Sequence, residues 1–318
     1  MVDPAGVGLY ERRLRRAALD RVGGGPPSTL ADPGATGADQ ASLEAVFAHV
    51  AHRRARRSRA GGADRRAGAL AATVETGTGP SAPERSAAPE RSAGDGTGWR
   101  LLEVEEVGPT LRLLRVERPP GFEFVAGQYV KAGVGGVGRS SFSIASAPHD
   151  PFLELCVGLQ PGGKVSPALF RLVPGDAVDL VPRAKGRFVL QPAADTHLMV
   201  ATSTGIGPLR SMLRDSLHRG LPGRFVVLHG ASTPDRLPYR AELGSLASAD
   251  RRVEYRSTIS GSTGRVSAGR VDPLAEQVAG DLDPASTVAY VCGHPGMVDS
   301  VRATLSRAGF EVRSEKFD

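Results

Sequence analysis

Short runs of apolar and β-branched residues, broken by glycine, proline and charged residues, dominate the chain between residues 98 and 193. The runs long enough to form strands are 100–107, 110–116, 128–134, 141–146, 152–159, 177–181 and 186–190. Short strands separated by frequent turn residues are typical of small antiparallel barrels. The pattern therefore predicts an antiparallel β-barrel domain over residues 98–193.

From residue 194 to residue 318 the pattern changes to apolar runs that alternate with stretches of helical period. The expected strands are 197–202, 224–228, 253–257, 287–291 and 312–315, and the expected helices are 208–218, 239–247, 273–278 and 297–308. Alternating strands and helices predict an α/β domain with a parallel sheet covered on both faces. Ligands of such sheets bind beyond the carboxyl ends of the strands, so segments 203–208 and 292–296 are expected to line a site.

Residues 1–97 have a different character. Of the 16 aromatic residues, only Tyr10 and Phe47 precede residue 98, and residues 61–98 consist mainly of Ala, Gly, Ser, Pro, Arg and Glu. Such a stretch buries too little apolar surface to offset its chain entropy. Residues 43–50 carry one apolar stripe of helical spacing, which is either a marginal helix or a docking element for a partner. We predict a low-complexity, mostly disordered tail with one possible short helix.

Charge and cysteine content exclude several classes of protein. The net charge is +6, but only four of the 40 basic residues are lysine, and the one dense arginine run, at residues 53–59, has no aromatic residues for base stacking. We therefore expect no nucleic-acid partner. The sequence has no apolar run long enough to span a membrane and no signal-peptide pattern, which favours a cytoplasmic location. The two cysteines are too few for an iron–sulfur cluster or a structural zinc site, so any redox centre must be an organic cofactor.

One turn in the first domain has the features of an anion site. Residues 161–167 place two glycines before Ser166, the expected N-cap of a helix, and Pro167, its expected first residue. Free backbone N–H groups and the positive end of a helix dipole then lie together. Read by itself, the same pattern fits an ordinary junction between a loop and a helix equally well.

Several short motifs, taken in order, resemble the ferredoxin–NADP reductase family. The motifs are Ser141–Pro148, Gly163–Ser166, Pro174–Asp176 with Gly186–Phe188, Thr204–Pro208, Cys292–Pro295 and Glu315–Phe317. The resemblance covers residues 98–318 and implies a flavin-binding barrel followed by a pyridine-nucleotide domain. It implies FAD as cofactor, with FMN less favoured, and no metal.

The resemblance also implies roles for individual residues. Ser143 and Cys292 are expected at the hydride-transfer site, where Ser143 hydrogen-bonds the flavin, Phe142 stacks on its ring, and Cys292 and Thr204 border the nicotinamide. The further cofactor-binding residues that it implies are Arg139, Gly163, Lys164, Val165, Ser166, Gly205, Ile206, Gly207, Pro208, Gly293, Pro295 and Phe317. Phe317 either covers the flavin or packs the last strand, and Cys156 is expected to be an ordinary core residue.

This sequence departs from the family pattern at four places. Phe142 replaces the usual tyrosine, so it can stack on the flavin ring but cannot offer the phenol hydrogen bond. Ser140 stands where the family has the arginine that pairs with the flavin diphosphate, so Arg139, one residue earlier, serves only if a bulge turns it to the same face. Ser203 replaces a glycine of the nicotinamide loop. Residues 257–260 lack the arginine that binds the extra phosphate of NADPH, which favours NADH slightly unless Arg236, Arg256 or Arg265 compensates.

The sequence therefore predicts a flavin-dependent oxidoreductase. Hydride would pass from NAD(P)H to bound flavin, and single electrons would then pass to a separate acceptor such as an iron–sulfur protein or an oxygenase component. Two alternatives stay open at this point. One is a free-flavin or quinone reductase, and the other is a non-catalytic flavin or nucleotide sensor.

Overall fold

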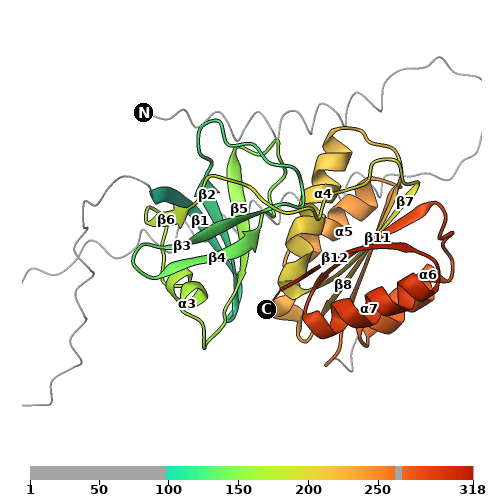
Figure 1. The fold of residues 1–318 in the computed structure, drawn as a ribbon. Coiled ribbons are helices and arrows are strands. Elements are labelled where there is room, and N and C mark those ends of the chain that lie inside the picture. The colour runs from blue at the N-terminus through green and yellow to red at the C-terminus, as the bar shows by residue number, and fades with distance from the viewer. Residues whose placement is uncertain (1–97, 262–266, 318) are drawn as a thin grey trace, which may run out of the picture. The chain divides into compact units, whose positions relative to one another are not determined.

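The computed structural model describes residues 98–261 and 267–317. The predictions for residues 1–97, and the proposed role of Arg265, lie outside these residues. The structure confirms the predicted fold class of an antiparallel barrel followed by a parallel α/β sheet (Figure 1). No helix within the described ranges is long and apolar enough to cross a lipid bilayer.

The first half of the described chain is an antiparallel sheet that closes on itself. Its strands are β1 (Gly98–Gly108), β2 (Leu111–Glu117), β3 (Tyr129–Val134), β4 (Gly138–Ser143), β5 (Phe152–Gly158) and β6 (Ala177–Leu180), in the order β4-β3-β6-β1-β2-β5. A bridge between Ile144, just beyond β4, and Leu155 on β5 joins the two edges. Leu114, Val130, Leu153 and other aliphatic side chains fill the interior, and the helix α3 (Val165–Leu169) packs against it.

The second half is a parallel sheet with helices on both faces. Its strands, in the order β10-β9-β8-β7-β11-β12, are β7 (Thr196–Thr202), β8 (Arg224–Ala231), β9 (Val253–Ile259), β10 (Ser267–Ala268), β11 (Thr287–Gly293) and β12 (Glu311–Lys316). The helices α4 (Ile206–His218) and α5 (Arg240–Ala249) share one core, and α6 (Val271–Ala279) and α7 (Pro295–Arg307) share the other, on the opposite face (Figure 1). Two 3₁₀ turns, η1 (Ser203–Gly205) and η2 (Pro234–Arg236), follow β7 and β8.

One predicted strand is absent, and the reason lies in its side chains. Residues 186–190 form no strand; the chain makes only a bridge between Lys185 and Tyr129. Gly186 then takes a positive φ of 111°, and Phe188 leaves the barrel to pack in the core of the parallel sheet, edge-on to Tyr290. The short edge strand β10, in contrast, was not predicted, because two residues carry no period.

Candidate functional site

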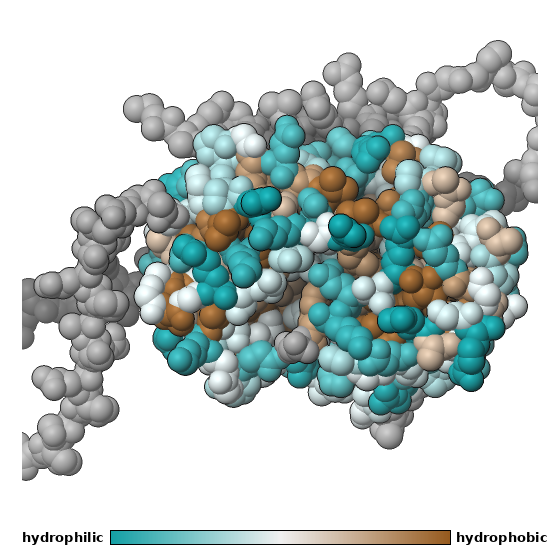
Figure 2. All heavy atoms as spheres, viewed as in Figure 1, coloured by the Kyte–Doolittle hydropathy of each residue, from teal (hydrophilic) through white to brown (hydrophobic). Residues whose placement is uncertain are grey.

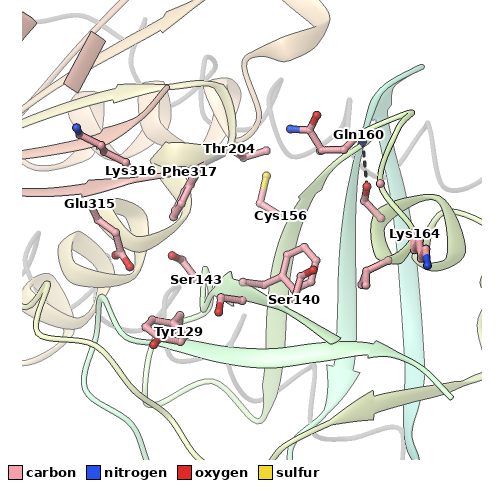
Figure 3. A pocket seen from close by; sticks show the side chains of 16 residues that line it. Tyr129, Ser140, Ser143, Cys156, Gln160, Lys164, Thr204, Glu315, Lys316 and Phe317 are labelled. Carbon is pink, nitrogen blue, oxygen red and sulfur yellow. Dashed lines mark hydrogen bonds between the residues drawn. The ribbon is translucent and has the colours of Figure 1, made fainter. Parts of the chain in front are cut away.

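A cavity of about 500 Å³ lies where the barrel meets the parallel sheet. It is lined by Tyr129, Ser140, Ser141, Phe142, Ser143, Cys156, Gly158, Gln160, Gly163, Lys164, Val165, Ser166, Thr204, Glu315, Lys316 and Phe317. Figure 2 shows this face of the molecule hollowed between the two halves, and Figure 3 shows the lining side chains. We call it the first cavity. It brings together four segments that the sequence analysis had identified separately.

Strand β4 supplies one wall of the first cavity, but Arg139 does not reach it. The ladder between β3 and β4 is unbroken from Tyr129–Ser143 to Gly133–Arg139. Without a bulge, Arg139 stays outside the lining, and its guanidinium donates instead to Asp179 on β6 at 2.7 Å. The role predicted for Arg139 required a bulge, so the structure does not support it.

Two buried polar atoms in the first cavity have no hydrogen-bond partner in the described protein. They are the Oγ of Ser143 and the Oε2 of Glu315. Figure 3 shows both side chains at the same end of the cavity, beside Phe317. Burial raises the pKa of the Glu315 carboxyl. Glu315 is part of the C-terminal motif Glu315–Phe317, but its sequence context predicted no role for its side chain.

The turn before α3 supplies the opposite end of the first cavity. Ser166 was the predicted N-cap, but the structure places the N-cap at Lys164, so Ser166 and Pro167 lie within the helix. The Ser166 hydroxyl accepts a hydrogen bond from the backbone N–H of Gln160 at 2.9 Å and closes the turn (Figure 3). Lys164 is exposed and is the basic residue that lines this end of the cavity.

Both cysteines are buried, and Cys156 belongs to a hydrophobic core cluster, as expected. Cys292 is fully buried in a hydrophobic core and lines neither the first cavity nor the second cavity described below, whereas Cys156 also lines the first cavity with its thiol directed inward (Figure 3). Burial raises the pKa of both thiols. Neither sulfur is therefore a ready thiolate, and Cys292 contributes through its backbone: a Cβ on Gly205 would lie 2.3 Å from its carbonyl oxygen.

A second cavity, of about 620 Å³, lies at the carboxyl ends of the parallel strands, as expected for this sheet type. It is lined by Thr110, Gly158, Leu159, Gln160, Pro161, Thr202, Ser203, Thr204, Gly230, Ala231, Ser232, Arg236, Ser260, Gly269, Arg270, Val271, Asp272, Gly293, His294, Met297 and Phe317. Thr204 and Phe317 also line the first cavity. The two cavities therefore meet at these side chains.

Most of the residues predicted to bind the nicotinamide nucleotide do not line the second cavity. Thr204 and Gly293 line it, but Gly205, Ile206, Gly207, Pro208 and Pro295 do not. Gly293 has a φ of +140°, and a Cβ there would lie 2.2 Å from the hydroxyl of Thr202. This glycine is therefore required by both its backbone conformation and its neighbour.

Ser203 adopts a backbone conformation that favours glycine, with a φ of +48°. Its carbonyl accepts a hydrogen bond from Nε2 of the buried His229 at 3.1 Å. Burial lowers the pKa of His229 to about 4, so the imidazole is neutral at physiological pH. The hydrogen bond holds the loop in a conformation that a serine would otherwise disfavour.

Arg236 and Arg256, named as candidates for phosphate binding, differ in their partners from each other and from Arg270, which the sequence did not single out. Arg256 is paired with Glu254 and lies outside the second cavity. Arg270 lines the cavity but forms an ion pair with Asp272 at 3.0 Å. Arg236 lines it too, and its buried Nε has no hydrogen-bond partner in the described chain. Arg236 is therefore the cation of this set that is available to a ligand.

No group of three or more His, Cys, Asp or Glu side chains able to hold a metal occurs among the described residues. His197, another strand-end histidine, is buried and stacks on Phe225 with ring centroids 4.8 Å apart. Burial lowers its pKa to about 4.

The chain is similar to known proteins both in sequence and in fold. Residues 199–303 match the family model of the oxidoreductase NAD-binding domain. The chain is 39% identical over 218 residues to ferredoxin–NADP reductase B of Sorangium cellulosum, covering 64% of this chain and 88% of that protein.

Two solved structures have similar folds. The ferredoxin NADP⁺ reductase of Neisseria gonorrhoeae with bound FAD and NADP has a TM-score of 0.62 at 23% identity, covering 69% of this chain and 98% of that one. A cytochrome P450 reductase from Amycolatopsis has a TM-score of 0.60 at 26% identity, covering 69% of each chain.

Proposed function

The chain belongs to the ferredoxin–NADP reductase family, and from this premise we propose that the first cavity binds FAD and the second binds the nicotinamide nucleotide. The protein is an NAD(P)H-dependent flavoprotein oxidoreductase that passes electrons through flavin to a separate acceptor protein. The observation that carries the site assignment is the pair of unpartnered buried polar atoms, Ser143 Oγ and Glu315 Oε2, in a cavity lined with aromatic side chains.

The lining of the first cavity fits an isoalloxazine ring. Phe142 and Tyr129 offer aromatic surface from the barrel, and Phe317 offers it from the end of β12. Aromatic faces favour a planar heterocycle in offset or edge-on contact. The Ser143 hydroxyl and the Glu315 carboxyl are the polar groups available to its heteroatoms, and a ligand that pairs with them removes the cost of leaving them buried and unpaired.

Bound flavin supplies hydride acceptance and one-electron release, chemistry that no side chain of the protein offers. The chain contributes orientation and exclusion of water. Thr204 and Phe317 stand between the two cavities, so they border both the flavin and the nicotinamide in this arrangement. Holding the two reacting rings in contact converts their encounter into an intramolecular step.

FAD is preferred to FMN in this proposal because of the turn at the other end of the first cavity. Gly163 and Lys164 line the cavity at this turn, and Figure 3 shows Lys164 far from Ser143, so the turn suits the diphosphate of a dinucleotide. We expect the purified protein to bind FAD more tightly than FMN, measured by fluorescence titration of each. Equal affinity for the two flavins would contradict this assignment.

Lys164 and Arg139 provide a matched test of the diphosphate contact. Lys164→Ala should weaken FAD binding about tenfold, because a charge-assisted hydrogen bond contributes about 1.5 kcal/mol or more. Arg139→Ala should leave FAD affinity within about twofold, because its guanidinium is occupied by Asp179 outside the cavity. Titration of each variant with FAD measures both effects, and a large loss from Arg139→Ala alone would reverse the assignment.

We propose NADH as the slightly preferred donor. Residues 257–260 carry no arginine, and Arg270 and Arg256 are engaged by carboxylates. Arg236 is assigned to the diphosphate that NADH and NADPH share.

Arg236→Ala should therefore raise the Kd of NADH and NADPH by the same factor, about tenfold. Arg256→Ala, which removes an arginine outside the second cavity, should change neither Kd. The Kd values are measured by titrating the FAD-loaded protein with NAD⁺ and NADP⁺ as well as with the reduced forms under anaerobic conditions. Selective loss of the phosphorylated nucleotides would instead assign Arg236 to the 2′-phosphate and refute the preference for NADH.

The acceptor class is also part of the proposal. An iron–sulfur protein or an oxygenase component fits the relatives named above, and a cytoplasmic location remains a prediction from the sequence. Fast reduction of a one-electron acceptor with slow turnover of free flavin is the expected result. Faster turnover of free flavin than of the one-electron acceptor would favour a free-flavin reductase.

A further inference from the structure

Helix α4 connects the second cavity to the flavin-binding strand through a buried arginine. The helix begins at Ile206, directly after the loop that contains Thr204, and Arg210 lies on its second turn. Arg210 is only 5% exposed. Its Nη1 donates to the backbone carbonyl of Ala145 at 2.6 Å and to Oε1 of Glu154 at 3.0 Å. The Arg210 guanidinium thus contacts both edges of the barrel sheet: the segment that follows β4 and strand β5.

The rest of the guanidinium is held from the α/β side. Its Nε donates to both carboxylate oxygens of Glu242 at 3.0 Å, and its charged carbon lies 4.2 Å from the centroid of the Tyr239 ring. Tyr239 itself has a φ of +60°, in the left-handed region. Arg210 therefore has fixed partners on every side, and it has little freedom to move relative to either half of the protein.

Ala145 is a point of contact between the two halves. It lies two residues after Ser143, on the extension of β4, and a Cβ on Gly207 of α4 would be 3.4 Å from its Cβ. The next residue of α4 after Arg210 makes a parallel contact: the Ser211 hydroxyl donates to the carbonyl of Ser146, the residue after Ala145, at 2.6 Å. Consecutive contacts from α4 therefore fix the position of the Ser143 strand relative to the Thr204 loop.

Stability alone does not explain this arrangement. Glu154 is 1% exposed and also pairs with Arg115 at 2.6 Å, so a charge network has been taken out of water. The cost of desolvating such charges often exceeds their attraction, and apolar side chains of similar volume usually stabilise a fold at least as well. What the arginine offers beyond an apolar residue is a directional bond to the carbonyl of Ala145.

We propose that Arg210 is a positioning residue for hydride transfer: by bonding the carbonyl of Ala145, it sets the spacing between the Ser143 strand and the Thr204 loop. This inference rests on the proposed function, because the spacing matters only if flavin and nicotinamide meet between these segments. Misplacement of reacting groups by about 1 Å lowers a rate by as much as about 100-fold. Arg210 touches neither ring in this account and acts only through the backbone of β4.

The test uses the FAD-loaded double variant Arg210→Met/Glu154→Gln, which removes the charge pair together and leaves no lone charge buried at the junction. In stopped flow, the limiting rate of flavin reduction at saturating NADH should fall about 10- to 100-fold, with the Kd of the nucleotide within about threefold of wild type. Hydrogen exchange of the FAD-free protein should be faster in the backbone amides of residues 144–147. A purely structural role would lower the melting temperature without separating rate from affinity.

Arg252→Met is the matched control. Arg252 also joins a carbonyl, that of Leu221, to a carboxylate, that of Asp250, but it does so within the α/β half of the protein. The Arg252→Met variant should leave the limiting rate of flavin reduction unchanged.

Should the double variant not fold, Arg210→Lys provides a second test. Lysine keeps the charge but loses the planar guanidinium, and the variant is expected to show the same separation of rate from affinity. A folded variant of either kind with the wild-type limiting rate overturns the inference, whereas a wild-type protein that neither nucleotide reduces refutes the proposed function itself.

Discussion

Gly205→Ala is expected to lower the limiting rate of flavin reduction by NADH at least about 100-fold. The new Cβ would lie 2.3 Å from the carbonyl oxygen of Cys292 and 2.8 Å from the Cα of Gly293. Both neighbours are backbone atoms, so the two loops must separate by about 1 Å before ordinary contact is restored. That displacement moves Thr204 at the junction of the two cavities, where small changes in position have large effects on rate.

The same substitution should lower the free energy of unfolding by about 1–3 kcal/mol, as overpacking in a core does. Gly244→Ala is the control: no atom lies within 4 Å of a Cβ there, and the residue is in the middle of α5. Alanine should stabilise that helix by about 0.5–1 kcal/mol without changing the rate. Stopped flow and urea unfolding measure both. A Gly205→Ala protein with the wild-type rate would show that the close approach of the loops has no part in hydride transfer.

Ser143→Ala should lower the limiting rate of flavin reduction about 10- to 100-fold. The Ser143 Oγ has no hydrogen-bond partner among the residues that the structure describes, so alanine leaves no group newly unsatisfied there, and the stability of the FAD-free protein should not fall. In the loaded protein, the lost hydrogen bond removes about 1.5–3 kcal/mol if it is made to the charge that develops during transfer. The expected signature is therefore unchanged unfolding and slower chemistry.

Ser140→Ala is the matched control for Ser143. Ser140 lines the same cavity from the same strand, but it is exposed and reaches solvent. Its removal should leave the limiting rate within about twofold of wild type. Single-turnover kinetics measure the limiting rate of flavin reduction in both variants and in the wild type. Equal rates for Ser143→Ala and Ser140→Ala would remove Ser143 from the mechanism.

The architecture followed from sequence because its signals are local. Alternating and continuous apolar runs identified the antiparallel and parallel strands, and the loops after β7 and β11 lie at the ligand-binding edge, as the topology requires. Residues 186–190 were wrongly predicted to form a barrel strand, because the apolar Phe188 was taken to pack inside the barrel. It fills the core of the other half of the molecule, and a pattern along the chain does not show which core a side chain enters.

The site was harder to predict where it depends on which face a side chain occupies. Arg139 was a candidate only if β4 had a bulge, and the regular pairing with β3 turns it to Asp179. Cys156 was expected to be a core residue because it lies in an apolar strand, and it does join a core cluster, but the strand pattern does not show that it also lines the first cavity. Nothing near Glu315 in the sequence shows that its Oε2 is buried with no partner among the described residues, since that follows from the approach of β12 to the barrel.

The central claim is that a nicotinamide in the second cavity delivers hydride to a flavin in the first. Anaerobic titration of the FAD-loaded protein, first with NADH and then with NADPH, tests it most directly. The account predicts that the flavin absorbance bleaches with one equivalent of NADH, and with NADPH at a somewhat higher concentration. A protein that takes up neither FAD nor FMN, or a bound flavin that stays oxidised with both nucleotides, would contradict it.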